Sequence, residues 1–470
     1  MTQADGRAET LHSAHAAPAR VAAPPVARPR PVGRRNACPT LSAPMETGDG
    51  LLARFRPVVP GFSINQARGL AATARRSGNG IIEITARGSL QIRGLSAETV
   101  PQLTMDILAT GIVPASGVAV EVPPLAGIDP LETADPRDLA DRLRARIETT
   151  MQGRVIAPKL SIVVDGGGRF DLSRLTADIR LRALERTGSE WTLSIGGTEE
   201  AARTCASLSV TEAVDAVIAL LQLFADKGPG TRARDVTDGD LRLLFRQYGQ
   251  SNSPVLPKAE ISSGAGIHDL GSAGTMLALR LAYGQVRSTE LGALADAAGM
   301  CGAMEIRPAP QHSLFVLGLD AERATRLKEA AATLGFRTEA NDSANHIAAC
   351  AGAGACASAF YSTRSLGEAA LQNAPELLDG SLMLHLSGCP KGCAHPGRSA
   401  IAFVGTPTGY GLVVNGSASA EPEAYIGRGG VNEALAGLAR LVRNNKHAGE
   451  SALACLTRLG THEIAKATQG

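Results

Sequence analysis

The sequence predicts an α+β protein in which one layout of elements occurs twice. Residues 51–112 and 276–336 each run strand, helix, strand, strand, helix, judged from the period of their apolar residues. This order is that of the ferredoxin-like, split β-α-β unit. A second segment follows each unit and begins with an apolar strand, at 159–166 in one half and at 381–388 in the other. We therefore expect a pseudo-two-fold repeat of a ferredoxin-like unit and a larger α+β unit.

The expected elements of the two ferredoxin-like units correspond one to one. The segment "IIEIT…LQIRGL" of the first unit lies over "AMEIR…LFVLGL" of the second, with an insertion of two residues. Helices are predicted where apolar residues recur every three or four positions, and strands where they alternate. In chain order these are a strand at 51–58, a helix at 64–78, strands within 80–95, a helix at 96–111, a strand at 276–284, a helix at 288–300, strands within 302–319 and a helix at 320–335.

Shifts in composition mark the expected domain boundaries. The start of the chain is rich in Ala, Pro and Arg and lacks the apolar core of a secretory signal, so we predict a disordered tail rather than a targeting peptide. Stretches 227–240 and 249–258 are the expected linkers between the halves. The predicted units are the tail 1–36, a ferredoxin-like half-domain at 37–115, an α+β domain at 116–248, a second ferredoxin-like half-domain at 249–340 and a second α+β domain at 341–470.

The composition argues against two classes of partner. A formal net charge of +2 and an aromatic content of 3% provide neither the field nor the stacking surface of a nucleic-acid binder. The longest apolar stretch, 213–225, contains Asp215 and is too short to span a membrane. Without an export signal we expect a cytoplasmic protein, in which cysteines serve metal or redox chemistry more often than disulfides.

Four cysteines of the second half are the strongest chemical signal. Cys350 and Cys356 stand in "CAGAGACAS", and Cys389 and Cys393 stand in "GCPKGC". Four thiolates from two loops suit a tetrahedral zinc site or a 4Fe–4S cluster. Five intervening residues are many for a zinc pair, and small neighbours let backbone N–H groups face cluster sulfides, so the cluster is favoured. The alternative is four unrelated core thiols, which the Gly- and Pro-containing loops argue against.

This cysteine spacing on a two-fold repeat closely resembles the sulfite and nitrite reductases, which carry a 4Fe–4S cluster and sirohaem. Within that superfamily the chain is most similar to the precorrin-3B synthases of aerobic cobalamin biosynthesis. The residues that carry this second resemblance are "ACPTLSAPMETGDGLLARFRP" (37–57) and "GCAHPG" after the last cysteine. The resemblance covers about residues 36–465 and implies α+β units of the sulfite/nitrite reductase type.

The resemblance also implies a reaction. A precorrin-3B synthase is a monooxygenase that hydroxylates the tetrapyrrole precorrin-3A with O2 and forms a lactone. The resemblance implies a 4Fe–4S cluster on the four cysteines and a mononuclear non-haem iron. No pattern in the sequence identifies the ligands of that iron or any other catalytic residue. Two further functions stay open: a sirohaem-dependent sulfite or nitrite reductase, and a non-catalytic iron–sulfur or tetrapyrrole-binding protein. No strand–GxGxxG–helix fingerprint is present, so electrons are expected from a separate NAD(P)H-dependent reductase or a ferredoxin.

A tetrapyrrole is fringed with acetate and propionate groups, so a protein that holds one needs arginines or lysines aimed at a cavity. If "ITARGSLQIRG" stays extended, Arg87, Gln91 and Arg93 share one face of a strand. Phe315 and Leu317 stand at the positions of Gln91 and Arg93 in the second unit. A polar face in one copy alone is expected of a ligand surface.

The resemblance adds to this set. It implies that Arg87 lies at the macrocycle and that Lys159 falls near lysines of the anion site. Arg54 belongs to the adjacent predicted strand and completes the expected substrate residues. The alternative is an ordinary solvated strand face, which alternating polar residues often form.

Overall fold

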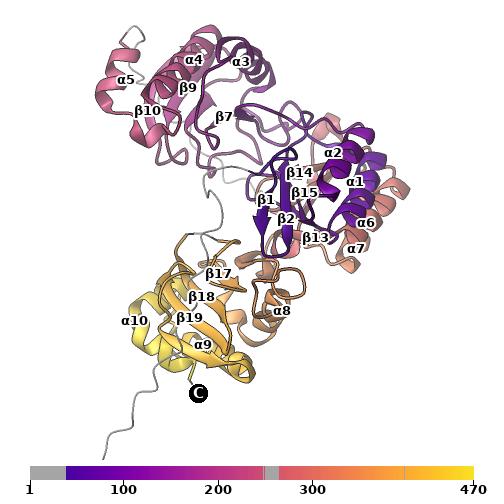
Figure 1. Ribbon diagram of the computed structural model, residues 1–470, viewed down its shortest axis with the longest axis vertical. Helices are drawn as coiled ribbons and strands as arrows, with labels where there is room; N and C mark the ends of the chain where they lie inside the picture. Colours follow the sequence, from indigo (N-terminus) through magenta and orange to yellow (C-terminus); the bar gives the residue numbers. More distant parts are fainter. Residues whose placement is uncertain (1–38, 247, 249–263, 396, 470) are drawn as a thin grey trace, which may run out of the picture. The chain divides into compact units, whose positions relative to one another are not determined.

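The computed structural model describes residues 39–246, 248, 264–395 and 397–469 (Figure 1). The predicted tail 1–36, the predicted linker 249–258 and Cys38 lie outside the described residues. The described chain is a mixed α+β structure, as predicted, and it contains four five-stranded sheets. In this part of the chain, every helix falls short of the length and apolarity that crossing a membrane requires.

The two ferredoxin-like units form two sheets of matching order. The orders are β1-β2-β5-β4-β13 and β11-β12-β15-β14-β3, and all neighbours are antiparallel. Each sheet therefore receives its last strand from the other half of the chain. The bounds are β1 Met45–Thr47, β2 Gly50–Phe55, β3 Phe62–Ser63, β4 Ile81–Ile84, β5 Leu90–Leu95, β11 Gly266–Asp269, β12 Thr275–Arg280, β13 Gln285–Arg287, β14 Glu305–Ala309 and β15 Ser313–Leu319.

The helices of both units pack into a single hydrophobic core. Leu70 and Ile107 of the first unit are buried in the same cluster as Leu294 and Leu327 of the second. The first helix begins after Ser63, whose side chain accepts the N–H of the third helical residue. The helices are α1 Ile64–Ser77, α2 Thr99–Ala109, α6 Ser288–Met300 and α7 Ala321–Thr333, each within two or three residues of the predicted bounds.

The two larger units also repeat one topology. Their sheet orders are β10-β9-β8-β7-β6 and β16-β17-β18-β19-β20, and in each the three strands that come first in the chain are parallel. In Figure 1, α9 and α10 lie next to β18 and β19. The strands are β6 Ala119–Glu121, β7 Ser161–Asp165, β8 Ile179–Ala183, β9 Glu190–Ile195, β10 Arg203–Ser209, β16 Ile347–Ala349, β17 Leu384–Ser387, β18 Ser399–Thr406, β19 Gly409–Gly416 and β20 Ala424–Gly427. The helices are α3 Arg137–Thr150, α4 Val210–Lys227, α5 Asp238–Leu244, α8 Thr363–Asn373, α9 Val431–Asn445 and α10 Ala452–Ala467.

The prediction of a linker at 227–240 is wrong. Ala233 and Val236 are buried in the core of the first α+β unit. Arg232 forms a bidentate ion pair with the buried carboxylate of Asp178. Apolar burial and this pair hold the segment against the unit, although its glycines and charges resemble those of a loop.

Candidate active site

Two cysteine-bearing loops leave the same edge of the second α+β sheet. The strands β16 and β17 are parallel neighbours, so their carboxyl ends meet. Cys350 follows β16 directly, and Cys389 lies just beyond the end of β17. The backbone N–H of Gly388 donates a hydrogen bond to Cys350 Sγ at 3.2 Å. The fold thus brings together two loops that are distant in the chain.

The thiol groups on these loops affect one another electrostatically. Burial raises the pKa of Cys350, and negative charge on Cys389 or Cys356 raises it further. Desolvation of its sulfur, and then the charges of Cys350 and Cys389, raise the pKa of Cys393 to about 11, although that residue as a whole lies at the surface. Four thiolates in this setting need a compensating positive charge, which a bound metal centre provides.

The donor set fits an iron–sulfur cluster better than it fits a single ion. The charges of Cys350, Cys389 and Cys356 all act on Cys393, and Cys350 already accepts a backbone N–H. Gly392 has a φ of 62°, so the turn between Cys389 and Cys393 uses a conformation that favours glycine. Among the residues that the structure describes, no three His, Cys, Asp or Glu side chains are grouped to hold one metal ion.

The equivalent edge of the first α+β sheet is closed by the protein itself. Asp165, fully buried at the end of β7, pairs with Arg182 at 3.0 Å. A Cβ atom added to Gly166 would lie 1.8 Å from the carbonyl oxygen of Ala134. The two loops here touch backbone to backbone, which leaves no room for a cluster. The asymmetry between "DGGGRFD" and "GCPKGC" is therefore also an asymmetry of packing.

A polar network covers one face of the first ferredoxin-like sheet. Arg54 Nε donates to Gln91 Oε1 at 2.8 Å, and Gln91 Nε2 donates to Glu83. Arg93 is buried and donates to both carboxylate oxygens of Asp49, at 3.0 and 2.8 Å. Its remaining nitrogen lies 3.4 Å from Glu83. Gln91 and Arg93 do share one face, and the guanidinium of Arg93 is held between two carboxylates.

The segment around Arg87 does not stay extended. The chain turns between β4 and β5, where the N–H of Thr85 donates to the carbonyl oxygen of Ser89 at 2.8 Å. Gly88 has a φ of 80°, far from the negative φ of regular extended backbone. Arg87 therefore lies in a hairpin turn at the end of the polar face and not on the strand itself.

Arg87 points to the first α+β unit. It forms an ion pair with Glu121 of β6 and donates to the carbonyl oxygen of Thr176 at 2.6 Å. Arg56 lies 2.7 Å from the same carboxylate. Lys159 is exposed in the loop that precedes β7.

The polar network begins at the cysteine loops. The turn between β1 and β2 packs on the first loop, where the N–H of Ala357 donates to the carbonyl oxygen of Gly48 at 2.8 Å. A Cβ atom at Gly48 would lie 2.6 Å from Cys356 Sγ. Asp49, the next residue, holds Arg93. Burial acts to lower the pKa of that guanidinium, but the charges of Glu83 and Asp49, and to a smaller extent that of Cys356, raise it. The first cysteine loop and the polar face are therefore contiguous.

The most informative comparison is with a precorrin-3B synthase from Sinorhizobium sp. The two sequences are 48% identical over 435 residues, which is 92% of this chain and 94% of that protein. This chain belongs to the precorrin-3B synthase family. The family assignment agrees with the cysteine spacing and with the repeat.

More distant comparisons agree on the superfamily and the fold. Residues 43–109 match the nitrite/sulfite reductase ferredoxin-like half domain. A ferredoxin–nitrite reductase from Synechococcus elongatus is 25% identical over 75% of this chain and 78% of its own length. The solved structure of the Mycobacterium tuberculosis NirA protein has a TM-score of 0.63 and 18% identity, and covers 88% of this chain and 84% of that chain. The last likeness concerns the fold alone.

Sequence reasoning missed four charged residues in this family member. Asp49 and Glu83 hold Arg93, while Arg56 and Glu121 surround Arg87. One signal was available for Glu83, since it interrupts the apolar strand "IIEI" at a position that faces Gln91 across the ladder. No sequence pattern links Glu121 to Arg56, because they lie on different units.

His385 stands four residues before Cys389 in the sequence. It lies on β17, is fully buried, and within the described chain neither ring nitrogen has a hydrogen-bond partner. Burial, and then the neighbouring His395, lower its pKa to about 4. The ring centroids of the two histidines are 5.7 Å apart. His268 and His312 instead contact backbone carbonyls elsewhere.

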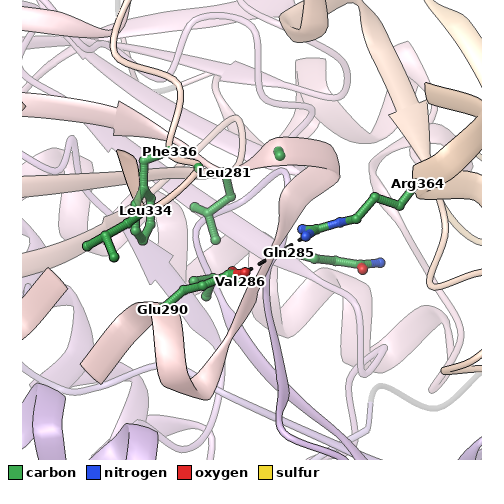
Figure 2. Close-up of a pocket in the computed structure, with 9 residues that line it drawn as sticks. Leu281, Gln285, Val286, Glu290, Leu334, Phe336 and Arg364 are labelled. Carbon is green, nitrogen blue, oxygen red and sulfur yellow. Dashed lines mark ion pairs between the residues drawn. The ribbon is translucent and has the colours of Figure 1, made fainter. Parts of the chain in front are cut away.

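A small hollow between the second ferredoxin-like unit and α8 is a separate feature. Figure 2 shows Arg364 of α8 extending toward Glu290 of α6, with the charged atoms 3.9 Å apart. The hollow has a volume of about 30 Å³, which suits water-sized molecules and is too small for a macrocycle. The other lining residues are Leu281, Ala282, Gln285, Val286, Leu334, Gly335 and Phe336.

Proposed function

We infer that this chain acts as a precorrin-3B synthase, which hydroxylates precorrin-3A with O2 and closes a lactone from a ring acetate. The observation that carries this inference is the 48% identity to a precorrin-3B synthase over nearly the whole of both chains. Site-level support comes from the two cysteine loops and the arginine-rich face beside them. The more distant reductases share the superfamily and not this degree of identity.

The reaction requires a reductant. Insertion of one oxygen atom from O2 into a C–H bond releases the other atom as water and consumes two electrons and two protons. We propose that a separate NAD(P)H-dependent reductase or a ferredoxin provides the electrons. A 4Fe–4S cluster held by Cys350, Cys356, Cys389 and Cys393 would supply one-electron transfer at this site.

The cysteine loops are held together by side chains of this chain as well as by backbone. Lys391, between Cys389 and Cys393, donates to Ser358 Oγ of the other loop at 3.0 Å. Ser387 donates to the carbonyl oxygen of Cys389 at 2.7 Å and fixes the start of the second loop. These contacts support the proposed ligand set, since preorganised loops lose less entropy on binding a cluster.

We propose that the polar face orients the carboxylate arms of the macrocycle. Arg54 and Arg87 are partly exposed and can offer guanidinium N–H groups to acetate or propionate. Gln91 and Arg93 are buried in the network, so their proposed part is to hold that face rigid. Lys159 is exposed and adds positive charge at its margin.

A direct test uses the full chain, prepared without oxygen and reconstituted with iron and sulfide. With precorrin-3A, a reductant and isotopically labelled O2, we expect one labelled oxygen atom in the product by mass spectrometry. The matched variant Cys389→Ser should show neither the cluster absorption nor the labelled product. Binding of precorrin-3A without turnover under these conditions would contradict the inference and favour a non-catalytic binding protein.

A sirohaem-dependent sulfite or nitrite reductase is the second candidate. The match of residues 43–109 to the reductase half domain favours it. Extraction of the isolated protein with acid acetone, followed by a visible spectrum, would reveal sirohaem. Sirohaem together with viologen-driven reduction of sulfite would establish this second function in place of the first.

A further inference from the structure

The carboxylate of Glu121 lies between two arginines, Arg56 and Arg87. Its Oε1 atom lies 2.7 Å from an Arg56 nitrogen and 3.1 Å from Arg87 Nε, and its Oε2 atom contacts the other end of the Arg87 guanidinium. The carboxylate is 8% exposed, while the two arginine side chains are 27% and 32% exposed. The second contact of Arg87, with the carbonyl oxygen of Thr176, fixes the direction of its guanidinium.

The carboxylate comes from a different unit from the arginines. Arg56 follows β2 and Arg87 lies in the turn after β4, both in the first ferredoxin-like unit, whereas Glu121 is the last residue of β6. The chain between them is tied down, because the N–H of Ala115 donates to the carbonyl oxygen of Arg56 at 2.7 Å. Only the short segment from Ala115 to Glu121 separates this anchor from the carboxylate, so Glu121 is present at the arginines at a high effective concentration.

We propose that Glu121 determines substrate selectivity by acting as a built-in counter-ion, which keeps small oxyanions out of the Arg56–Arg87 site. A free sulfite, nitrite or formate ion must displace a tethered carboxylate, and it is then held at this one site alone. A macrocycle with many linked carboxylates can exchange one arm for Glu121 while its other arms stay bound, so it competes as a multivalent ligand. This selectivity rests on the proposed function, because it assumes a polycarboxylate substrate.

The experiment uses the full chain without tetrapyrrole and small anions as probes. Glu121→Ala removes the internal carboxylate and leaves a space the size of formate or acetate between the two guanidinium groups. We expect formate to raise the thermal unfolding temperature of this variant saturably, with a half-maximal concentration at least tenfold lower than any response of the wild type. The double variant Glu121→Ala/Arg87→Gln should lose that response. Glu376→Ala, which removes the partner of a single exposed arginine, Arg443, is the matched control and should not gain one.

The outcomes separate the two proposals. Equal formate dependence of wild type and Glu121→Ala would overturn the role of Glu121. If Glu121→Ala does not accumulate as folded protein, Glu121→Gln keeps the shape and removes the charge, so formate has only a neutral amide to displace. A gain in formate response over the wild type then supports the proposal, and no gain overturns it. Since no tetrapyrrole is present, failure here leaves the synthase function untouched. Absence of precorrin-3A turnover by the wild type would contradict the synthase function and would leave the anion-binding result unchanged.

Discussion

Replacing Arg93 by methionine should destabilise the first ferredoxin-like sheet by about 3–5 kcal/mol, the usual cost of removing one partner from a buried ion pair. The side chains involved are nearly inaccessible: Arg93 is 8% exposed, Asp49 5% and Glu83 14%. Methionine fills much of the volume but leaves two carboxylates without a cation. Water cannot solvate them at this depth, so the full cost of the unpaired charges is felt.

A surface pair on a neighbouring helix is the matched control. Arg76 of α1 pairs with Asp106, but its own side chain is 58% exposed. Arg76→Met should therefore cost no more than about 1 kcal/mol. The contrast between two arginine-to-methionine changes in one unit separates burial from loss of charge.

Hydrogen exchange measured by mass spectrometry on peptides that cover β5 is the appropriate assay, because a chain with several units does not unfold as one cooperative step. A loss of about 4 kcal/mol corresponds to exchange roughly a thousandfold faster in the protected amides. Peptides from the second α+β unit serve as the internal reference.

The effect should also depend on pH. Burial opposes ionisation of Asp49, but the hydrogen bonds and charge of Arg93 hold the pKa of that carboxyl below its usual range. The wild type thus keeps this stabilisation until the pH falls below the unfolded pKa. Without Arg93 burial dominates and the folded-state pKa rises, so protonation relieves the variant as the pH falls from 7 toward 5. The gap between wild type and variant should narrow on acidification.

A specific result would refute this reasoning. That result is an Arg93→Met protein that exchanges like Arg76→Met at β5 and yet binds tetrapyrrole far more weakly than the wild type. In that case Arg93 would be a ligand of the substrate and not a support of the sheet.

Three further predictions concern the proposed site. Cys389→Ser should abolish cluster absorbance and acid-labile sulfide, whereas Cys301→Ser, at the end of α6, should retain both; equal retention would contradict the ligand set. Arg87→Ala should weaken tetrapyrrole binding at least tenfold in fluorescence titrations while iron and sulfide contents stay unchanged, since it contributes charge and no metal ligand; unchanged affinity would remove it from the site. His385 is neutral when folded because burial lowers its pKa to about 4, so the unfolded chain takes up its proton first as the pH falls below 6.5. The apo-protein should therefore lose roughly 3 kcal/mol between pH 6.5 and 4 that His385→Leu does not lose, measured by hydrogen exchange on peptides that cover β17 in both proteins; parallel pH profiles would contradict this.

The local elements of the ferredoxin-like units follow from residue periodicity, and α6 agrees with its predicted range in full. Periodicity succeeds there because each helix has one face in the shared core. It cannot find β3, a strand of only two residues, or its exchange with β13 between the two sheets. Such short strands are specified by pairing partners far away in the chain.

The sequence by itself determined the repeat and the family, and it predicts the four cysteines as cluster ligands, because apolar period and cysteine spacing are local properties of the chain. Only the tertiary structure decided which charges meet. In the sequence, nothing distinguishes Arg93 from an arginine that binds substrate. In the structure, its carboxylate partners come from a turn and a neighbouring strand. Arg87 and Glu121 meet across two units, although each segment alone gives no sign of the other. The Coulomb energy of two charges depends on their distance and burial, and the order of residues along the chain gives neither quantity.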